Sequence, residues 1–323
     1  MIQIRGLYKY YGPSRAIGPL DVEVQAGQVV GLLGENGAGK TTTLRILACD
    51  LLPSAGQVMV DGYDVVDHPD EVRARVGYLP DKPPLYPEMT VREFLVFAAR
   101  LKGVSKGDVQ KRVNEAAEQT GIAARLDQVI GTLSHGFQQR VGIAQAIVHR
   151  PKFVVLDEPI SGLDPRQIVE MRHLIRGLAG DHTVLISSHI LSEISQTCDR
   201  LLVIRDGTIV ADDSEAAIVN RTLGGMRLSL LVSGLEVDAL RSLLQDLEAV
   251  EIVELGKEGK ALRAELRTQS DQRASIARRV VEAGAELLEL GRSEHELESV
   301  FMRLAEGSAY ADGGRSRQGG GVH

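Results

Sequence analysis

A glycine-rich segment that ends in lysine and threonine is the clearest sign of chemistry in this sequence. It reads Gly34-Glu35-Asn36-Gly37-Ala38-Gly39-Lys40-Thr41, with Thr42 next. Glycines let the backbone curl so that its N–H groups face a triphosphate. We predict that Lys40 reaches the outer phosphates and that the Thr41 hydroxyl binds Mg²⁺. The alternative is a chance glycine-rich turn, which the apolar run before it and the helical segment after it disfavour.

Two adjacent acids, Asp157 and Glu158, follow the apolar run 153–156. Ligands of open α/β sheets lie at the carboxyl ends of the strands, so both acids should face the phosphates. Neighbouring residues of a strand point opposite ways, and we therefore expect two roles. We assign Asp157 to Mg²⁺, through water, and Glu158 to the general base that activates the attacking water. The alternative is an acidic helix start, which the phosphate loop makes less attractive.

His189 follows the apolar run 183–186 and a pair of serines, Ser187 and Ser188. A neutral imidazole at this strand end is placed to contact the terminal phosphate and to orient Glu158 or the water. The alternative is an ordinary residue at a helix start, which is how we interpret the other histidines.

The elements around these residues predict an α/β fold for residues 1–222. Unbroken apolar runs are typical of parallel strands that are covered on both faces. Asp206-Gly207 lies between two apolar runs and predicts a hairpin turn. The strands are expected at 29–33, 153–156 and 183–186, the helices at 42–52, 91–102 and 107–120, and the hairpin at 201–210.

The pattern changes near residue 222, and the rest of the chain predicts a second domain. Its strand and helix signals follow the β-α-β-β-α-β order of a small α+β, ferredoxin-like domain, 223–306. The expected strands are 227–232, 250–255, 261–266 and 286–290, and the expected helices are 238–247, 271–283 and 294–306. Residues 307–323 are rich in Gly, Ser and Arg without apolar periodicity, so we predict a disordered tail.

Composition narrows the function further. A net charge of −7 disfavours a nucleic-acid partner. Cys49 and Cys198 lack metal-ligand spacing and fit a reducing cytoplasm. No apolar run approaches the roughly 18 residues that cross a bilayer, and the start lacks the apolar core of a signal peptide. Any membrane role therefore has to come through a partner.

Further segments, in the same order along the chain, complete a resemblance to the ABC ATPase family. Gly77–Asp81 resembles its Q-loop, Ser161–Asp164 its D-loop, and His189 its switch histidine. The family's signature segment has its counterpart in this chain, which resembles it at Leu133-Ser134-His135-Gly136-Phe137-Gln138-Gln139-Arg140. The resemblance runs over roughly residues 2 to 220 and implies a P-loop NTPase cassette with a helical subdomain. It also implies that Tyr11 stacks on adenine, with Tyr10 as the alternative.

Departures from the usual family pattern favour one branch. His135 and Phe137 stand where Gly and Gln are usual, and Asp81 stands where the Q-loop carries Gln. Exporter cassettes of the drug, polysaccharide and gliding-motility groups commonly carry such residues. The resemblance therefore implies an exporter ATPase, in which Asp81 can bind Mg²⁺ through water.

The resemblance also implies partners. Two cassettes pack head to tail, and ATP on one loop is capped by Ser134 and Gly136 of the other, with His135, Phe137 and Asp164 also acting in trans. A homodimer is the simplest form. A membrane-spanning permease subunit is expected to dock on residues 81–97, which places the chain in the cytoplasm, on the inner face of the cell membrane. Alternatives are a soluble ABC ATPase without a transport role, an importer ATPase and a nucleotide-gated dimeriser. The C-terminal domain is either a ligand sensor or a structural, dimer-stabilising module.

Overall fold

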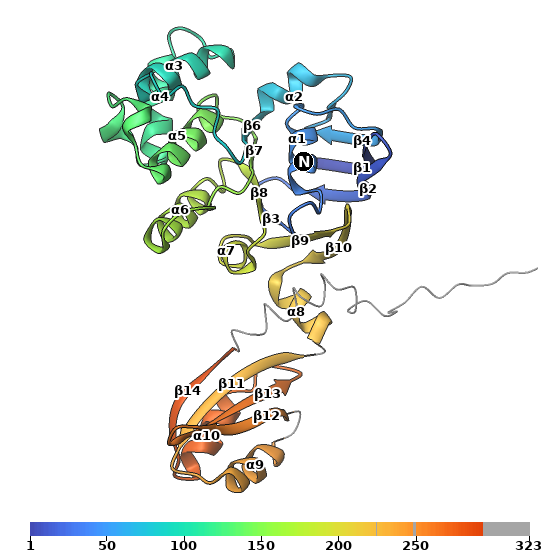
Figure 1. The fold of residues 1–323 in the computed structure, drawn as a ribbon, viewed down its shortest axis with the longest axis vertical. Helices are drawn as coiled ribbons and strands as arrows, with labels where there is room; N and C mark the ends of the chain where they lie inside the picture. Colours follow the sequence, from blue (N-terminus) through green and yellow to red (C-terminus); the bar gives the residue numbers. More distant parts are fainter. Residues whose placement is uncertain (224, 248–249, 293–323) are drawn as a thin grey trace, which may run out of the picture. The chain divides into compact units, whose positions relative to one another are not determined.

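The computed structural model describes residues 1–223, 225–247 and 250–292 (Figure 1). The chain divides into two compact units, Met1–Glu215 and a second that begins at Ala216. Helix α8 (Glu215–Leu223) starts at this division, and the predicted domain boundary at 222 lies near its end. The predicted helix 294–306 and tail 307–323 lie outside the described residues and stay predictions.

A six-stranded sheet forms the centre of the first unit, with strand order β10-β9-β3-β8-β7-β6. Every pair is parallel except β9 with β10. Strands β3, β7 and β8 are buried along their whole length, which confirms the three predicted strands. The strands are β3 (Val29–Leu33), β6 (Val76–Leu79), β7 (Phe153–Leu156), β8 (Thr183–Ser188), β9 (Arg200–Arg205) and β10 (Thr208–Asp213).

A second, antiparallel sheet with strand order β2-β1-β4-β5 lies in the same unit (Figure 1). It was not predicted from the sequence. Apolar side chains of this sheet, such as Ile4 and Leu20, share one buried cluster with Leu32 of β3 and Leu44 of the helix that follows the phosphate loop. This packing fixes the base of the phosphate loop. The strands are β1 (Ile2–Tyr11), β2 (Ser14–Val24), β4 (Ala55–Val60) and β5 (Tyr63–Asp64).

Helix α1 (Lys40–Leu47) is shorter than the predicted helix 42–52, because Cys49 adopts the left-handed conformation with φ 55° and ends it. Helices α3, α4 and α5 form a group apart from the antiparallel sheet, and the predicted helices 91–102 and 107–120 are confirmed there (Figure 1). No helix of the described residues is long and apolar enough to cross a membrane. The other helices of this unit are α2 (Pro69–Arg75), α3 (Val91–Leu101), α4 (Val109–Gln119), α5 (His135–Ile147), α6 (Pro165–Gly177) and α7 (Leu191–Ser195).

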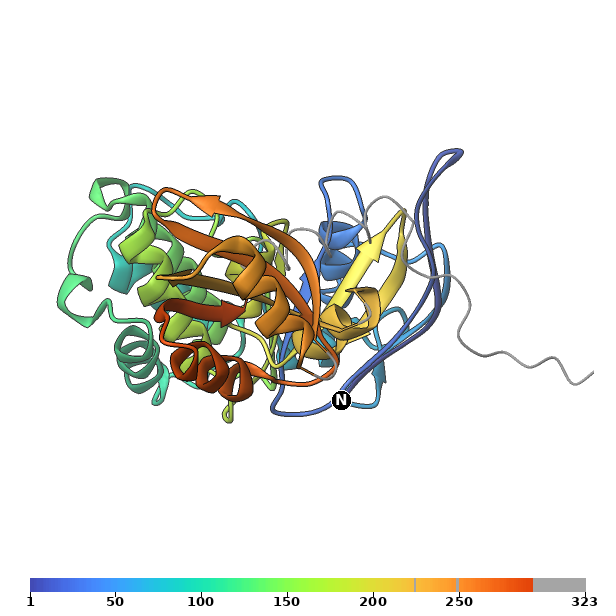
Figure 2. The ribbon, with the colours of Figure 1, turned by 90° about the horizontal axis from the view of Figure 1, so that it is seen from below.

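The second unit contains one antiparallel sheet with strand order β12-β13-β11-β14. Two helices pack on the same face of it, where Leu230 of β11 meets Leu240 of α9 and Ile276 of α10 (Figures 1 and 2). The elements are β11 (Met226–Ser233), α9 (Val237–Gln245), β12 (Val250–Glu258), β13 (Ala261–Thr268), α10 (Arg273–Glu282) and β14 (Glu286–Arg292).

Candidate active site

The carboxyl ends of the central parallel strands meet around one cavity of about 440 Å³. The phosphate loop follows β3, Asp81 follows β6, Glu158 follows β7, and His189 follows β8. Residues far apart in the sequence are thus brought to one edge of the sheet, as expected for an open α/β fold. The cavity is lined by Ala16, Asn36, Gly37, Gly39, Lys40, Thr41, Thr42, Asp81, Glu158, Ser161 and His189.

The phosphate loop needs its glycines for space and for backbone conformation. Gly39 has a φ of 107°, and a Cβ there would lie 2.9 Å from the carbonyl oxygen of Ala16. A Cβ on Gly34 would lie 2.4 Å from the carbonyl oxygen of Ile204. Because Gly39 is the N-cap of α1 and has no side chain, the first N–H groups of the helix are left for a ligand. The geometry of the loop and helix start therefore suits an anionic ligand.

Lys40 folds back over this loop. Its Nζ donates to the carbonyl oxygens of Gly34, at 2.8 Å, and Glu35, at 3.2 Å. The same Nζ lies 3.4 Å from Glu158 Oε1, and the Lys40 side chain is only 6% exposed. When a phosphate chain binds, its anionic oxygens can replace these neutral carbonyls as the acceptors of Lys40. Hydrogen bonds between two charged groups are stronger than those to a neutral carbonyl.

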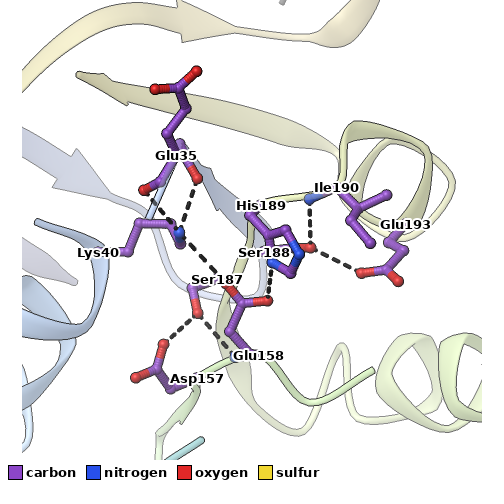
Figure 3. Close-up of polar contacts among 10 residues, drawn as sticks. Glu35, Lys40, Asp157, Glu158, Ser187, Ser188, His189, Ile190 and Glu193 are labelled. Atoms are coloured by element: carbon purple, nitrogen blue, oxygen red, sulfur yellow. Dashed lines mark hydrogen bonds and ion pairs between the residues drawn. The ribbon is translucent and has the colours of Figure 1, made fainter. Parts of the chain in front are cut away.

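Asp157 is almost fully buried beside the loop, and Ser187 holds it (Figure 3). The Ser187 hydroxyl donates to Asp157 Oδ1 at 2.6 Å. Burial raises the pKa of Asp157 above its usual value; the hydroxyls of Ser187 and Thr41 act against this rise, and the charges of Glu158 and Asp81 add to it. Asp157 Oδ2 is buried and accepts no hydrogen bond from the residues that the structure describes. Within residues 1–223, 225–247 and 250–292, this carboxylate forms no salt bridge.

Glu158 points its carboxylate between a lysine and a histidine (Figure 3). His189 Nδ1 lies 2.9 Å from Glu158 Oε2, while Oε1 faces Lys40. The backbone of Glu158 is left-handed, with φ 49°, which costs a non-glycine residue about 1–2 kcal/mol. Hydrogen bonds hold it there: its N–H donates to Ser187 Oγ at 2.9 Å, and its carbonyl accepts from the Ser161 N–H at 3.2 Å.

Ser187 was not predicted from the sequence as a site residue, although it contacts the site acids. Its hydroxyl contacts both acids, so it sets their positions together. The next residue, Ser188, turns away from the acids, donates to Glu193 Oε2 at 2.8 Å and accepts from the Ile190 N–H at 3.0 Å (Figure 3). The signal was the pair of serines before His189, but the strand pairing was needed to tell their roles apart.

The signature segment opens helix α5 and does not line the cavity of its own chain. Ser134 is the exposed N-cap of α5, and its side chain makes no capping hydrogen bond. Gly136 is buried where a Cβ would lie 2.6 Å from Gln167 Oε1. The Phe137 ring stacks with the Arg125 guanidinium, 3.9 Å from the ring centroid. A hydroxyl at a helix start, outside the chain's own cavity, is compatible with a ligand held by a second molecule.

Two further residues that the sequence predicted for the site, Tyr11 and Asp164, do not line the cavity of their own chain. Tyr11 ends β1 and is 48% exposed, with Lys9 Nζ 5.4 Å from its ring centroid, and it is not among the cavity-lining residues. Asp164 is the N-cap of α6, where its side chain accepts from the Gln167 N–H at 2.9 Å. Asp164 thus has a structural role within its own chain.

A parallel sheet with a glycine-rich loop before a helix, a lysine on that loop and an Asp-Glu pair beside it define a P-loop ATPase. The sequence profile of the family described as "ABC transporter" matches residues 17–161. The chain is 32% identical to the bacitracin transport ATP-binding protein BcrA of Bacillus licheniformis, over 95% of this chain and 98% of that protein. It is 33% identical to the Nod factor export ATP-binding protein I of Ralstonia nicotianae, over 94% and 93%.

A solved structure agrees with these sequence matches. The dimeric structure of MJ0796, a bacterial ABC transporter cassette, matches with a TM-score of 0.60 and 25% identity, over 66% of this chain and 98% of that one. The chain belongs to the ABC transporter family, as an ATP-binding subunit that hydrolyses ATP.

Proposed function

We propose that this ATPase powers an exporter whose membrane-spanning subunits are separate chains. The observation that carries the proposal is the placement of Glu158 between Lys40 and His189 in the cavity, because it is the geometry of an ATPase with an active base. The names of the two relatives, bacitracin transport and Nod factor export, support transport as the use of that energy. Asp81, His135 and Phe137 support the exporter branch.

Hydrolysis uses the groups of this cavity in distinct roles. The water oxygen bonds to the γ-phosphorus, the bond to the β,γ-bridging oxygen breaks, and ADP leaves with the electron pair. Glu158 accepts the proton of the attacking water, and His189 orients that carboxylate. Lys40 contacts the β- and γ-phosphate oxygens and stabilises their charge.

The same site fits Mg²⁺. Asp157 has a buried oxygen without a partner, the Thr41 hydroxyl lies close enough to lower its pKa, and Asp81 lines the cavity. No group of three or more His, Cys, Asp or Glu side chains among the described residues forms a metal site. This donor set suits an ion that keeps waters and takes phosphate oxygens as ligands. Mg²⁺ would neutralise charge on the phosphates when bound.

The complete ATP site needs a second cassette. Ser134 and Gly136 belong to a helix start that does not line the chain's own cavity, so we infer that they cap ATP bound to a partner copy. The dimeric MJ0796 cassette supports such pairing. Closure of two copies around ATP and release after hydrolysis would supply the mechanical step.

The permease is expected to dock beside the Q-loop, on the inner face of the cell membrane. Tyr86 and Phe97 are 46% and 43% exposed, and their rings meet edge to face at 5.8 Å. An exposed aromatic pair on a helical subdomain suits an apolar partner segment.

The second unit, with strand order β14-β11-β13-β12, is inferred to be a ferredoxin-like accessory domain.

Affinity purification from solubilised native membranes tests this proposal. Tagged Glu158→Gln protein, with ATP and Mg²⁺, should recover a protein with several membrane spans. The variant Phe97→Asp in this background should lose that partner, while Leu52→Asp, at a residue 63% exposed outside the docking segment, should keep it. Recovery of ribosomes, DNA or no partner would leave the ATPase standing and would refute the exporter.

A further inference from the structure

The start of helix α5 is joined to the loop that follows the catalytic Asp-Glu pair. His135 Nε2 lies 3.3 Å from the carbonyl oxygen of Ser161. A Cβ on Gly162, which has a φ of 73°, would lie 3.4 Å from the same nitrogen. The imidazole therefore lies directly against the backbone of Ser161-Gly162. We call the contact between His135 and Ser161 the His135 bridge.

Both ends of this bridge adjoin groups of the reaction. Ser161 lines the nucleotide cavity, and its N–H donates to the carbonyl oxygen of Glu158 at 3.2 Å. His135 follows Ser134 directly at the start of α5. One short path of hydrogen bonds and backbone thus runs from Glu158 through Ser161 and His135 to Ser134.

The bridge is separate from the contacts that hold α5 and α6 together. Gly136 packs against the Gln167 side chain, and Arg140 pairs with Glu170 at 2.9 Å. His135 itself is exposed, so loss of its ring removes little buried surface. The helix pair should therefore persist when the bridge is removed.

We propose that His135 is a positioning residue that couples the two ATP sites of the dimer. The inference rests on the head-to-tail pairing proposed above. In that pairing Glu158 acts on the ATP of its own chain, and Ser134 caps the ATP of the partner copy. A shift of the Glu158–Ser161 backbone on hydrolysis is passed by the His135 bridge to Ser134, and so to the other site.

Steady-state ATP hydrolysis by full-length protein tests the bridge. The wild-type rate should rise cooperatively with ATP, with a Hill coefficient above 1, and His135→Ala should bring it to about 1. His135→Gln keeps an N–H donor at a similar reach and should retain cooperativity. His173→Ala, at an exposed histidine of α6, is the matched control and should retain it too. The Tm of each variant should match the wild type.

Each other outcome counts against the inference. Hyperbolic kinetics in the wild type would mean that there is no coupling to transmit. Unchanged cooperativity in His135→Ala would overturn the bridge, and equal loss in His135→Gln would assign the effect to ring packing instead. ATP-dependent dimerisation of Glu158→Gln separates the causes. If that variant stays monomeric, the proposed head-to-tail pairing is wrong. If it dimerises, the pairing stands and only the proposed role of His135 is wrong.

Discussion

The Ser187 hydroxyl donates to Asp157 Oδ1 at 2.6 Å. Ser187 Oγ also accepts a hydrogen bond from the backbone N–H of Glu158. One hydroxyl at the end of β8 thus positions two acids at the end of β7 (Figure 3). The register of β7 and β8 brings these residues together, because Leu156 pairs with Ile186. The next residues after this pair are Asp157 and Ser187.

Replacing Ser187 by Ala should slow hydrolysis more than it weakens ATP binding. The change removes a hydrogen bond to a charged group, worth about 1.5–3 kcal/mol, which corresponds to roughly 10- to 100-fold in kcat. Steady-state kinetics and nucleotide titration measure the two effects. Ser192→Ala, at an exposed serine of α7, is the control. A kcat equal to that of the wild type would show that Ser187 does not position the acids.

The variant Glu158→Gln should bind ATP and accumulate as dimers without turning over. Gln keeps the size of the side chain but cannot accept a proton from water. Size-exclusion chromatography with ATP and a phosphate-release assay check both parts. Glu118→Gln, at an exposed residue of α4, should behave as the wild type. Undiminished phosphate release from Glu158→Gln would remove this residue as the base.

Lys40→Ala should reduce ATP affinity by about 10- to 100-fold, because charge-assisted hydrogen bonds to the phosphates are lost. Isothermal titration with ATP measures the change. Lys106→Ala, at an exposed lysine, is the matched control. Equal affinities for the two variants would contradict the phosphate-loop assignment.

Asp157→Asn should raise stability without nucleotide while it removes Mg²⁺-dependent hydrolysis. The folded pKa of Asp157 is raised above its usual 3.8, so the folded state holds the proton more tightly than the unfolded state does. Above its raised pKa the buried carboxylate is ionised, and its burial then lowers the free energy of unfolding. The advantage of Asn should shrink as pH falls through the raised pKa and should vanish below the usual Asp pKa, where both states are protonated.

Thermal unfolding at several pH values checks this expectation. A difference of 1 kcal/mol corresponds to about 2–4 °C in Tm for a unit of this size. Asp181→Asn, at an exposed aspartate, should show no such pH-dependent gain. A lower Tm for Asp157→Asn at neutral pH would mean that the carboxylate is stabilising in the empty site.

Leu230→Ala should destabilise the second unit by about 2–5 kcal/mol, because Leu230 is fully buried between the sheet and both helices. Leu288→Ala, at a leucine of β14 that is 54% exposed, should have little effect. Hydrogen exchange over residues 226–292 measures the loss. ATP affinity should not change in either variant; a fall would show that the second unit supports the nucleotide site.

Strands β3, β7 and β8, which position the phosphate loop, the two acids and His189, were predictable from the sequence because they are buried on both faces. Runs such as 153–156 therefore lack polar residues, and the acids that follow them stand out. The antiparallel sheet escaped prediction, although Asp21-Val22-Glu23-Val24 in β2 alternates with period two.

Long-range contacts were beyond the sequence pattern. The fold of Lys40 onto the carbonyls of Gly34 and Glu35 depends on the closed loop, and the choice between Ser187 and Ser188 depends on which faces β7. The early end of α1 at Leu47 follows from the left-handed Cys49, which no turn residue announces.

Because Glu158 has a left-handed backbone, the residue that would be most stable at this position differs from the residue that the proposed activity needs. Glycine at this position would relieve the conformational cost of about 1–2 kcal/mol and would remove the proposed general base in the same step. A laboratory screen that rewards heat resistance alone would therefore drift towards inactive proteins here. A screen that couples survival to transport would hold the glutamate in place.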